Sequence, residues 1–462
     1  MQTGVISLPG AADQGATFLG HPRGLVALFF TELWERFSYY GMRALLVLYM
    51  VAPIAEGGLG FDTRLAATIY GVYTMSVYMS SIPGGLVADR LLGARKAILV
   101  GGLIIAAGHF CLALPAINTF VAGLVMIVVG TGLLKPNISA LLGSLYAEGD
   151  DRRDAGFSIF YMGINMGAAL SPIVCGYLAQ DPSFKAKLVS MGFSPHSSWH
   201  WGFAAAGVGM LIGLVHFVLQ KKLLGTAGDK PIKPQSAATA EKPAERFTPE
   251  ELKRVGAIGI LFFFNMLFWS VYEQGGSSLN LFADRMTRNE IFGWPFPSSW
   301  FQSVPAIFVI VMAPLISWVW MRLGHKQPSS PAKFTVGLLF LGLGIALAVP
   351  ATILAAHGKV SPLWLCGVYF LQVVGELCLS PVGLSTVTKL APARIVGLTM
   401  GVWFVSMALG NYLAGWLAGF FDEKNANALL GLFGGMGIAC LIATVILAML
   451  TPTVRRLMGG IR

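Results

Sequence analysis

The chain has 462 residues, of which 55% are hydrophobic and only 12% are charged, and its mean hydropathy is +0.69. This balance excludes an ordinary soluble domain, because soluble proteins carry roughly twice that share of charged residues. The net charge of +10 comes mostly from Lys and Arg on one side of the predicted membrane spans, so it does not indicate nucleic-acid binding.

Apolar runs long enough to cross a bilayer recur along the whole chain and predict an all-α polytopic membrane protein. We expect twelve transmembrane helices in two six-helix bundles. The expected spans are residues 25–51, 66–87, 97–114, 120–142, 157–178, 201–219, 255–272, 301–321, 334–354, 363–387, 396–420 and 429–450.

One polar stretch, residues 221–254, interrupts the spans and is rich in Lys, Glu, Pro and Ala. It predicts a cytoplasmic linker between an amino-terminal bundle (1–220) and a carboxy-terminal bundle (255–462). This layout is typical of the major facilitator fold, in which two halves rock around a central site. Because most Lys and Arg residues fall on the linker side, we expect both termini in the cytoplasm.

The segment after the second span, residues 84–96, resembles the loop motif of the major facilitator superfamily. Its glycines would allow close helix approach, and Asp89 and Arg90 with the following basic residues would tie the cytoplasmic ends together. We therefore expect a structural and gating role here. The alternative is an ordinary basic loop on the cytoplasmic side.

The first span carries an unusual concentration of charge. At about 100° per residue, its polar side chains share an arc of roughly 140°, so that face must look into protein or water. Those side chains are Glu32, Glu35, Arg36, Tyr39, Tyr40 and Arg43. Charge in hydrocarbon is costly and marks a functional site by default, although a purely structural ion-pair cluster is the alternative.

Three further charges lie within the expected spans: Lys135, Glu273 and Glu376. All intramembrane cations therefore belong to the amino-terminal half, and the carboxy-terminal half supplies only acids. Pairs of opposite charge between the halves could act as locks that are made in one state and broken in the other.

The first span matches the pattern E-x-x-E-R-F-x-Y-Y-G at residues 32–41, and a second long motif occupies residues 157–167. Similar stretches occur at 130–137, 268–274 and 375–381. Over essentially its whole length the chain resembles a bacterial member of the proton-dependent oligopeptide transporter family, within the major facilitator superfamily. The resemblance implies symport of di- and tripeptides with protons across the cell inner membrane, with the proton as coupling ion and no other cofactor.

Residue roles follow from the resemblance position by position. It implies proton coupling by Glu32, Glu35, Arg36 and Glu273, with Glu273 exchanging partners with Arg36. It implies peptide binding by Arg36, Tyr40, Tyr78, Lys135, Asn165, Trp269, Glu376, Ser380 and Trp403. It implies gating by Asp89, Arg90, Lys135 and Glu376.

The residue chemistry agrees with such a ligand. A short peptide is a zwitterion, so its site needs a cation, an anion and groups that hydrogen-bond the backbone. Arg36 and Lys135 could bind the carboxylate and Glu376 the ammonium, while roomy aromatic pockets would take the side chains. The candidate backbone-binding groups are Asn165, Tyr40 and Tyr78, and the candidate pocket aromatics are Phe160, Tyr161, Trp269 and Trp403.

Proton coupling has a similar basis, because desolvation disfavours a charged carboxylate and a nearby guanidinium favours it. Arg36 stays charged, so the acids must titrate. We expect protonation of Glu32 or Glu35, and of Glu273, to free cations for the peptide carboxylate or for a gate.

Two features depart from the family pattern. Many bacterial relatives have two extra helices between the halves, but residues 221–254 are too few and too polar to form them. The stretch 301–306 carries Pro305 where the family often has Asn, so a backbone-binding amide is expected to be missing there.

Two other functions compete. A carrier of another small solute, such as nitrate, a drug or a peptidomimetic, would keep the same fold and proton coupling. An intramembrane enzyme fits poorly, since there is no nucleophile with a base and no phosphate loop. We expect no metal site, because His196 and His200 lack a third ligand. The expected partners are peptides, protons and the lipid bilayer, and a monomer is expected to suffice.

Overall fold

The computed structural model describes residues 17–18, 20–147, 150–229, 247–392 and 395–459. In the amino-terminal part its elements are β1 (Thr17–Phe18), β2 (His21–Pro22), α1 (Gly24–Val51), α2 (Thr63–Met79), α3 (Ser81–Val87), α4 (Ala94–Leu112), α5 (Ile117–Gly143), α6 (Arg152–Gln180), α7 (Pro182–Ser190) and α8 (Ser198–Gln220). The carboxy-terminal part contains α9 (Pro249–Tyr272), α10 (Ser278–Arg285), β3 (Glu290–Ile291), β4 (Trp294–Pro295), α11 (Ser303–Leu323), α12 (Ser330–Ala346), α13 (Ala348–Ala355), α14 (Leu363–Leu390), α15 (Val396–Ala418) and α16 (Ala426–Leu457). Each pair of short strands, β1–β2 and β3–β4, is antiparallel.

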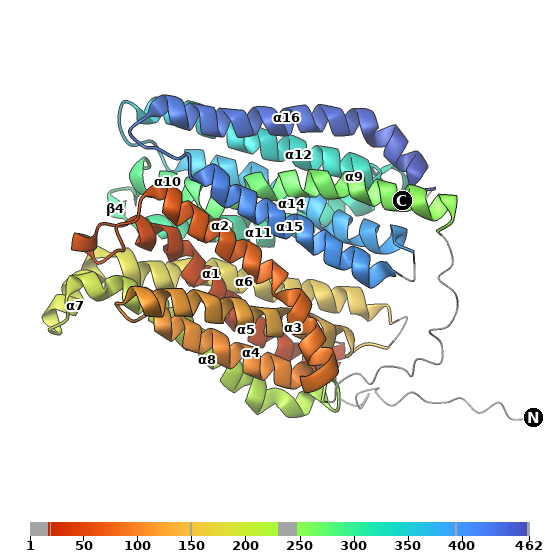
Figure 1. The fold of residues 1–462 in the computed structure, drawn as a ribbon, viewed down its shortest axis with the longest axis horizontal. Coiled ribbons are helices and arrows are strands. Elements are labelled where there is room, and N and C mark those ends of the chain that lie inside the picture. The colour runs from red at the N-terminus through yellow and green to blue at the C-terminus, as the bar shows by residue number, and fades with distance from the viewer. Residues whose placement is uncertain (1–16, 19, 148–149, 230–246, 393–394, 460–462) are drawn as a thin grey trace, which may run out of the picture.

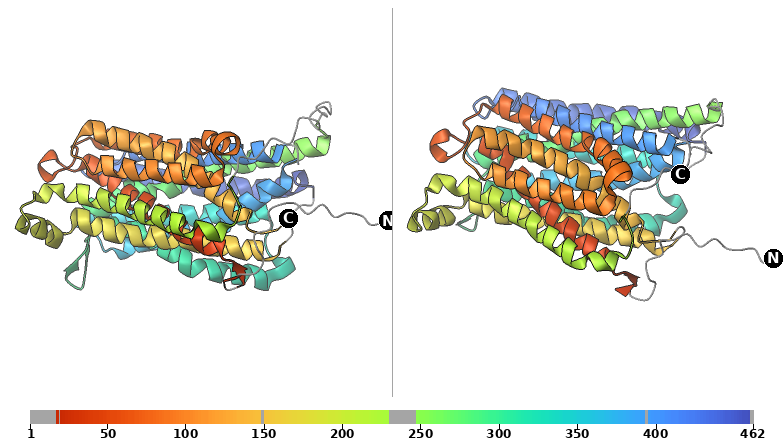
Figure 2. Two further views of the ribbon diagram at one scale, coloured as in Figure 1. Left: turned by 90° about the horizontal axis from the view of Figure 1, so that it is seen from below. Right: turned by 60° about the horizontal axis from the view of Figure 1, so that its bottom comes forward.

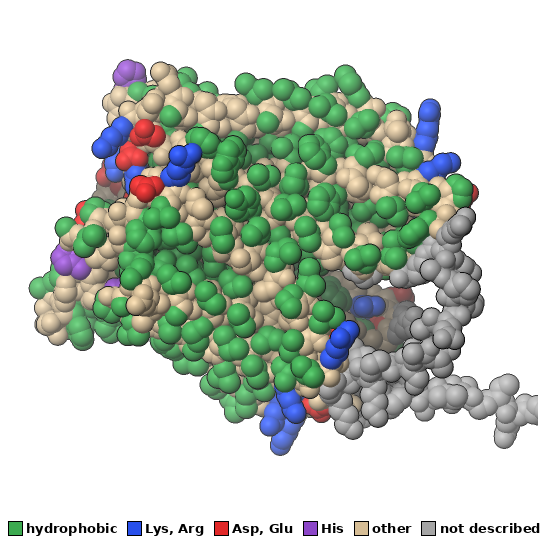
Figure 3. All heavy atoms as spheres, in the orientation of Figure 1, with side chains coloured by type: hydrophobic (Ala, Val, Ile, Leu, Met, Phe, Trp, Pro, Cys, Tyr) green, Lys and Arg blue, Asp and Glu red, His purple; other side chains and the backbone are tan. Residues whose placement is uncertain are grey.

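The long helices run side by side along one direction (Figures 1 and 2). Hydrophobic side chains cover the middle of the visible face, and Lys, Arg, Asp and Glu gather towards its ends (Figure 3). Within the described residues, ten helices are long and apolar enough to cross a membrane. Each of the twelve expected spans overlaps a continuous or interrupted helix, and the helices at the seventh and twelfth spans extend well beyond the expected ends.

The seventh span is longer than the sequence indicates. After α9 the chain makes a short helical turn, η6 (Glu273–Gly276), and continues as α10, so the span extends to Arg285 instead of ending at residue 272. The expected end was wrong because α10 is polar but buried inside protein. Asn280 is fully buried, and its Nδ2 donates a hydrogen bond to the carbonyl of Ala44 in α1 at 2.9 Å.

The segment after the second span is also more helical than a loop. α3 continues into η2 (Ala88–Leu92), and the chain turns at Gly93, whose φ is +76°. The expected close approach is confirmed, because a Cβ added at Gly84 would lie 2.0 Å from the carbonyl oxygen of Gly132 in α5. Only a glycine allows two helix backbones to touch in this way.

Helix contacts form two groups joined at a few crossings. α1 packs against α6 and α8, and α4 packs against α5; α12 packs against α14 and α16, and α9 packs against α15. The main crossings between the groups are α2 with α15 and α6 with α11. Figure 1 shows α2 and α15 lying next to each other.

The division at 220 and 254 stays a prediction, and residues 230–246 of the expected linker lie outside the described residues. α9 already begins at Pro249, inside the expected linker. There Thr248 and Glu251 form a reciprocal capping box that satisfies the free N–H groups of the first turn.

Candidate functional site

Two buried carboxylates share one guanidinium on α1. Glu32, Glu35 and Arg36 are only 3%, 0% and 4% exposed. Nε of Arg36 lies 3.1 Å from Oε1 of Glu32, which is one helical turn away, and it also donates to Glu35. Among the described residues, Glu32 Oε2, Glu35 Oε1 and Arg36 Nη2 are buried without a hydrogen-bond partner. The cluster therefore carries one excess negative charge when both acids are ionised, and it has unused donors and acceptors.

Glycines of α6 and α8 allow this turn of α1 to pack deep inside the protein. A Cβ added at Gly167 of α6 would lie 2.2 Å from the carbonyl oxygen of Leu33. One added at Gly213 of α8 would lie 2.9 Å from Cβ of Trp34. The close packing excludes lipid and solvent from the charged face, which raises the cost of an unpaired charge there.

A second ion pair connects the two helix groups. Nη2 of Arg43 donates to Glu273, at the break between α9 and α10, and Nε of Arg43 donates to the hydroxyl of Tyr70 at 2.6 Å. The break can approach Arg43 and Tyr70 this closely because Gly276 faces them. A Cβ added at Gly276 would lie 2.0 Å from the Tyr70 hydroxyl oxygen. Glu273 was expected to exchange with Arg36, but in this structure its partner is Arg43.

Lys135 and Glu376, expected to act together in gating, each have another neighbour. Nζ of Lys135 lies 4.3 Å from the ring centroid of Tyr78, within reach of a cation–π interaction. No carboxylate of the described chain lies within 4.0 Å of its nitrogen. Glu376 accepts a hydrogen bond from the hydroxyl of Tyr272. Among the described residues, Lys135 therefore has no acidic partner and Glu376 has no basic partner.

The expected pocket aromatics Trp269 and Trp403 are held by polar residues that the sequence reasoning missed. The indole N–H of Trp269 donates to Oδ1 of Asn265 at 3.1 Å, and Nδ2 of Asn265 donates to Oγ of Ser406 at 2.7 Å. Ser406 in turn donates to the carbonyl of Trp403 at 2.6 Å. Both tryptophans are more than nine-tenths buried. An Asn and a Ser inside otherwise apolar spans are the signal that could have identified this network.

Other candidates fall on different faces. Phe160 is 4% exposed and packs in a core cluster with Leu28 and Leu134, whereas Tyr161 is 39% exposed, and a pocket role for either residue stays a prediction. Successive helical residues point about 100° apart, which explains the difference.

The remaining expected peptide-binding groups lie on three helices. Nδ2 of Asn165 donates to the carbonyl of Tyr161 in its own helix at 2.9 Å. Oγ of Ser380 is buried and has no hydrogen-bond partner among the described residues. Tyr40 is partly buried, and its ring centroid lies 5.7 Å from the guanidinium carbon of Arg43.

The expected gating pair Asp89 and Arg90 is exposed and forms no salt bridge within the described part of the chain. Arg95, a later basic residue of the same motif, does form a salt bridge: its Nη1 lies 2.7 Å from Oδ1 of Asp229. Its Nη2 also donates to the carbonyl of Gly225 at 2.6 Å.

Pro305 lies in the first turn of α11, where a missing N–H breaks no helical hydrogen bond. Just before that helix, Nε2 of Gln302 donates at 2.5 Å to the carbonyl of Gly275 in the break of the seventh span. An amide is therefore present near this position, although its contact is with the backbone of the break.

The chain is similar to known transporters along nearly its whole length. The model of the POT family matches residues 95–234 and 230–433. The chain is 40% identical to the uncharacterized transporter YclF of Bacillus subtilis and 38% identical to the peptide transporter YePEPT of Yersinia enterocolitica. The alignments cover 96% of this chain in both cases, and 96% and 97% of those proteins.

Solved structures are similar along nearly the whole chain. A variant of the peptide transporter POT in complex with alafosfalin is 41% identical, with a TM-score of 0.87 over 96% of this chain and 97% of that one. A POT family transporter in complex with 5-aminolevulinic acid is 35% identical, with a TM-score of 0.84 over 95% and 98% of the two chains. The extended sequence identity and the shared fold show that this chain belongs to the POT family of membrane transporters.

Proposed function

We propose that this protein imports di- and tripeptides together with protons by alternating access. The observation that carries the proposal is the sharing of Arg36 by the buried Glu32 and Glu35. One guanidinium cannot neutralise two carboxylates, and an excess charge in a low-dielectric site is costly. Uptake of one proton by either acid makes the cluster neutral, which couples proton binding to the state of Arg36.

The pair of Arg43 with Glu273 supplies the switch in this proposal. It joins the two helix groups in the same region as the hydrogen bond from Asn280 to the carbonyl of Ala44. A neutral Glu273 would no longer hold the Arg43 guanidinium, and the two groups could separate on that side. Protonation from outside would therefore favour the state that admits substrate.

The ends of a peptide match Lys135 and Glu376, for which the described part of the chain offers no charged partner. Lys135 is partly exposed and stacks only on an aromatic ring, so its ammonium is available to a peptide carboxylate. Glu376, which accepts from a phenol, is available to the peptide ammonium. These two charges lie on α5 and α14, one in each helix group, so one zwitterion would bridge both groups. Relatives described as di-/tripeptide transporters and a family structure with the zwitterionic 5-aminolevulinic acid support this assignment.

The orientation and location are part of the proposal. Most of the 32 Lys and Arg residues lie at the linker end of the helices, which supports a cytoplasmic location of that end and of both termini. A bacterial inner membrane fits this arrangement, and a single chain contains every group used above.

Uptake of labelled dialanine into liposomes containing the pure protein tests the function. An inward proton gradient should drive accumulation in the wild type, and Glu35→Gln should abolish gradient-driven accumulation while leaving peptide exchange. Glu56→Gln, an exposed acid outside the spans, is the matched control and should behave as wild type. Accumulation that remained fully proton-driven in Glu32→Gln/Glu35→Gln would remove the coupling assignment. No uptake by correctly folded protein would favour nitrate or another small solute.

The role of Glu376 is tested by comparing dialanine with N-acetyl-dialanine, which lacks the ammonium. The wild type should prefer dialanine by about 1.5–3 kcal/mol, the range of a hydrogen bond to a charged group. Glu376→Gln should lose most of that preference while keeping its affinity for the acetylated peptide. A preference that is unchanged in the variant would assign ammonium binding elsewhere.

A further inference from the structure

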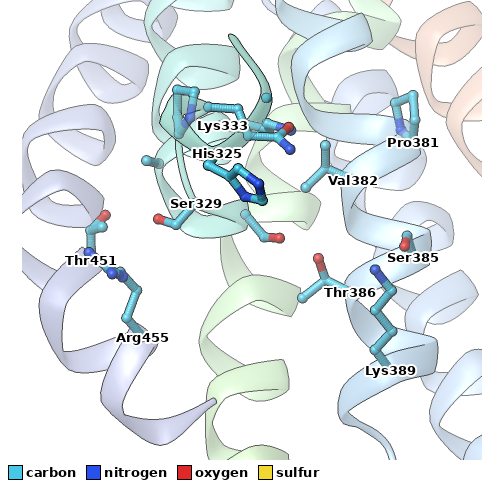
Figure 4. Close-up of a pocket in the computed structure, with 15 residues that line it drawn as sticks. His325, Ser329, Lys333, Pro381, Val382, Ser385, Thr386, Lys389, Thr451 and Arg455 are labelled. Carbon is cyan, nitrogen blue, oxygen red and sulfur yellow. The ribbon is translucent and has the colours of Figure 1, made fainter. Parts of the chain in front are cut away.

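A cavity of about 730 Å³ lies within the carboxy-terminal helix group, away from the charges described above (Figure 4). Its walls come from the connection between α11 and α12, the first turn of α12 and the last turns of α14 and α16. All of its lining residues belong to this helix group. None of them is one of the charged residues of the candidate site described above.

The cavity is lined by positive charge. Lys333, Lys389 and Arg455 reach it from three different helices, and His325 adds an imidazole (Figure 4). None of the lining residues is Asp or Glu. In the described part of the chain, no carboxylate lies within 4.0 Å of these three cations.

One of the cations is already held in position. Nζ of Lys333 donates to Oε1 of Gln327 at 2.8 Å and lies 4.7 Å from the ring centroid of Trp320. Both partners are neutral, so they orient the ammonium without cancelling its charge. An ordered cation loses less side-chain entropy when it binds an anion.

Neutral donors complete the site. α12 begins in the wall of the cavity, and its N-cap residue Ser329 makes no side-chain capping hydrogen bond. The first-turn N–H groups of Ser330 and Ala332 are therefore available, in the arrangement that binds phosphate at helix N-termini. Hydroxyl groups of Ser385 and Thr386 line the opposite wall.

The amino-terminal group shows how such a basic connection is otherwise neutralised. At the start of α4, just after the connection from α3, Arg95 is paired with Asp229 at 2.7 Å. The corresponding connection between α11 and α12 has no such acid among the described residues. A positively charged cavity without an internal counter-ion attracts an external anion.

We propose that this cavity binds a phosphate group, carried either by the headgroup of an anionic phospholipid such as phosphatidylglycerol or by free phosphate in the cytoplasm. Three cations, two hydroxyls and a helix N-terminus supply more donors than a carboxylate would use, and phosphate has the oxygens to accept them. Basic pockets between membrane helices on the cytoplasmic side bind anionic headgroups for the same reason. The lipid source depends on the orientation proposed above, whereas the chemistry of the cavity does not.

Binding to the full-length protein in neutral detergent tests the proposal without any transport assay. Native mass spectrometry compares the binding of dioleoyl-phosphatidylglycerol with that of dioleoyl-phosphatidylcholine. A thermal-shift assay measures the stabilisation of the protein by inorganic phosphate. The test variant is Lys333→Gln/Lys389→Gln/Arg455→Gln. The matched control, Lys96→Gln/Lys221→Gln/Lys222→Gln, removes the same charge from exposed positions outside the cavity.

Affinity should fall on the order of 100-fold in the test variant, because three losses of roughly fivefold multiply, and it should stay unchanged in the control. Loss of phosphatidylglycerol binding alone supports the proposal with the lipid as source, and loss of stabilisation by inorganic phosphate supports it with the free ion as source. If the triple variant does not fold, Lys389→Gln, an exposed position, should weaken binding roughly fivefold. Equal binding in test and control variants, or no preference over phosphatidylcholine together with no effect of phosphate, overturns the proposal.

Discussion

Gly415→Ala should shift the protein towards the state in which the two helix groups are separated at the crossing of α2 and α15. A Cβ added at Gly415 would lie 2.4 Å from Cα of Gly71 and 2.6 Å from the carbonyl oxygen of Ala67. Non-bonded carbons are comfortable at about 3.5–4.0 Å. The obstructing atoms belong to backbone, so no side-chain rotation can relieve the contact and the helices must move apart by roughly 1 Å.

The cost of overpacking gives the size of the shift. Extra atoms forced into a tight contact typically cost about 1–3 kcal/mol. The contact exists only while α2 and α15 touch, so this cost changes the ratio of closed to open states by a factor of roughly 5 to 160. Gly401→Ala is the matched control, because it lies in the same helix with no atom within 4 Å of its added Cβ. Both substitutions gain the same helix propensity, about 1 kcal/mol.

The assay is a distance distribution between spin labels on two exposed residues beyond the crossing, Glu56→Cys and Lys424→Cys, in a background without the native cysteines. Gly415→Ala should increase the population at the longer distance, and Gly401→Ala should leave the distribution as in the parent. An unchanged distribution in a folded Gly415→Ala protein would refute the reasoning that this crossing holds the closed state.

Three further substitutions follow from the same structure. Gly84→Ala places a Cβ 2.0 Å from a carbonyl oxygen of α5 and should destabilise the protein by about 1–3 kcal/mol. The adjacent Gly85→Ala is its control, because its added Cβ meets no atom within 4 Å. Equal melting temperatures of the two variants would contradict this contact. Glu273→Gln leaves Arg43 without its counter-ion in the closed state, at a cost of about 3–5 kcal/mol. It should therefore lengthen the spin-label distance as Gly415→Ala does. A distance distribution like that of the parent would exclude the Arg43–Glu273 pair as a lock between the helix groups. Asn280→Leu removes one hydrogen bond to α1, worth about 1 kcal/mol, and should shift the distances by a smaller amount, so a shift as large as that of Glu273→Gln would be inconsistent with it.

The charged turn of α1 could be predicted from the sequence because its pattern is local. Glu32 and Arg36 are one helical turn apart, so any helix at that position brings them together. Four charges in an apolar run also stand out against their neighbours. The structure places this pair as the spacing requires.

The partners of the other charges could not be predicted, because they depend on tertiary packing. Arg36 and Arg43 lie two turns apart on the same face, so the sequence alone does not decide which of them meets Glu273. α10 escaped detection because it buries polar residues against α1, and a hydropathy pattern interprets such residues as a loop. Asn265 and Ser406 each stand out as polar residues in an apolar span, but they belong to two different helices, so the sequence does not show that they bond to each other.

The intramembrane charges also account for why peptide and proton should move together. Counted in ionised form, the cluster of α1 carries one excess negative charge, the pair of Arg43 with Glu273 is neutral, and Lys135 balances Glu376. A zwitterionic peptide adds no net charge, so peptide alone leaves the site negative, whereas peptide with one proton makes it neutral.

The loaded carrier would then cross without net charge, and the empty carrier would return with its negative charge. A membrane potential that is negative inside favours that return by up to about 2.3 kcal/mol per 100 mV. Voltage steps on the empty protein should therefore produce a transient charge movement that disappears with saturating peptide at acidic external pH. A movement of equal size in the loaded protein would contradict this assignment of charges.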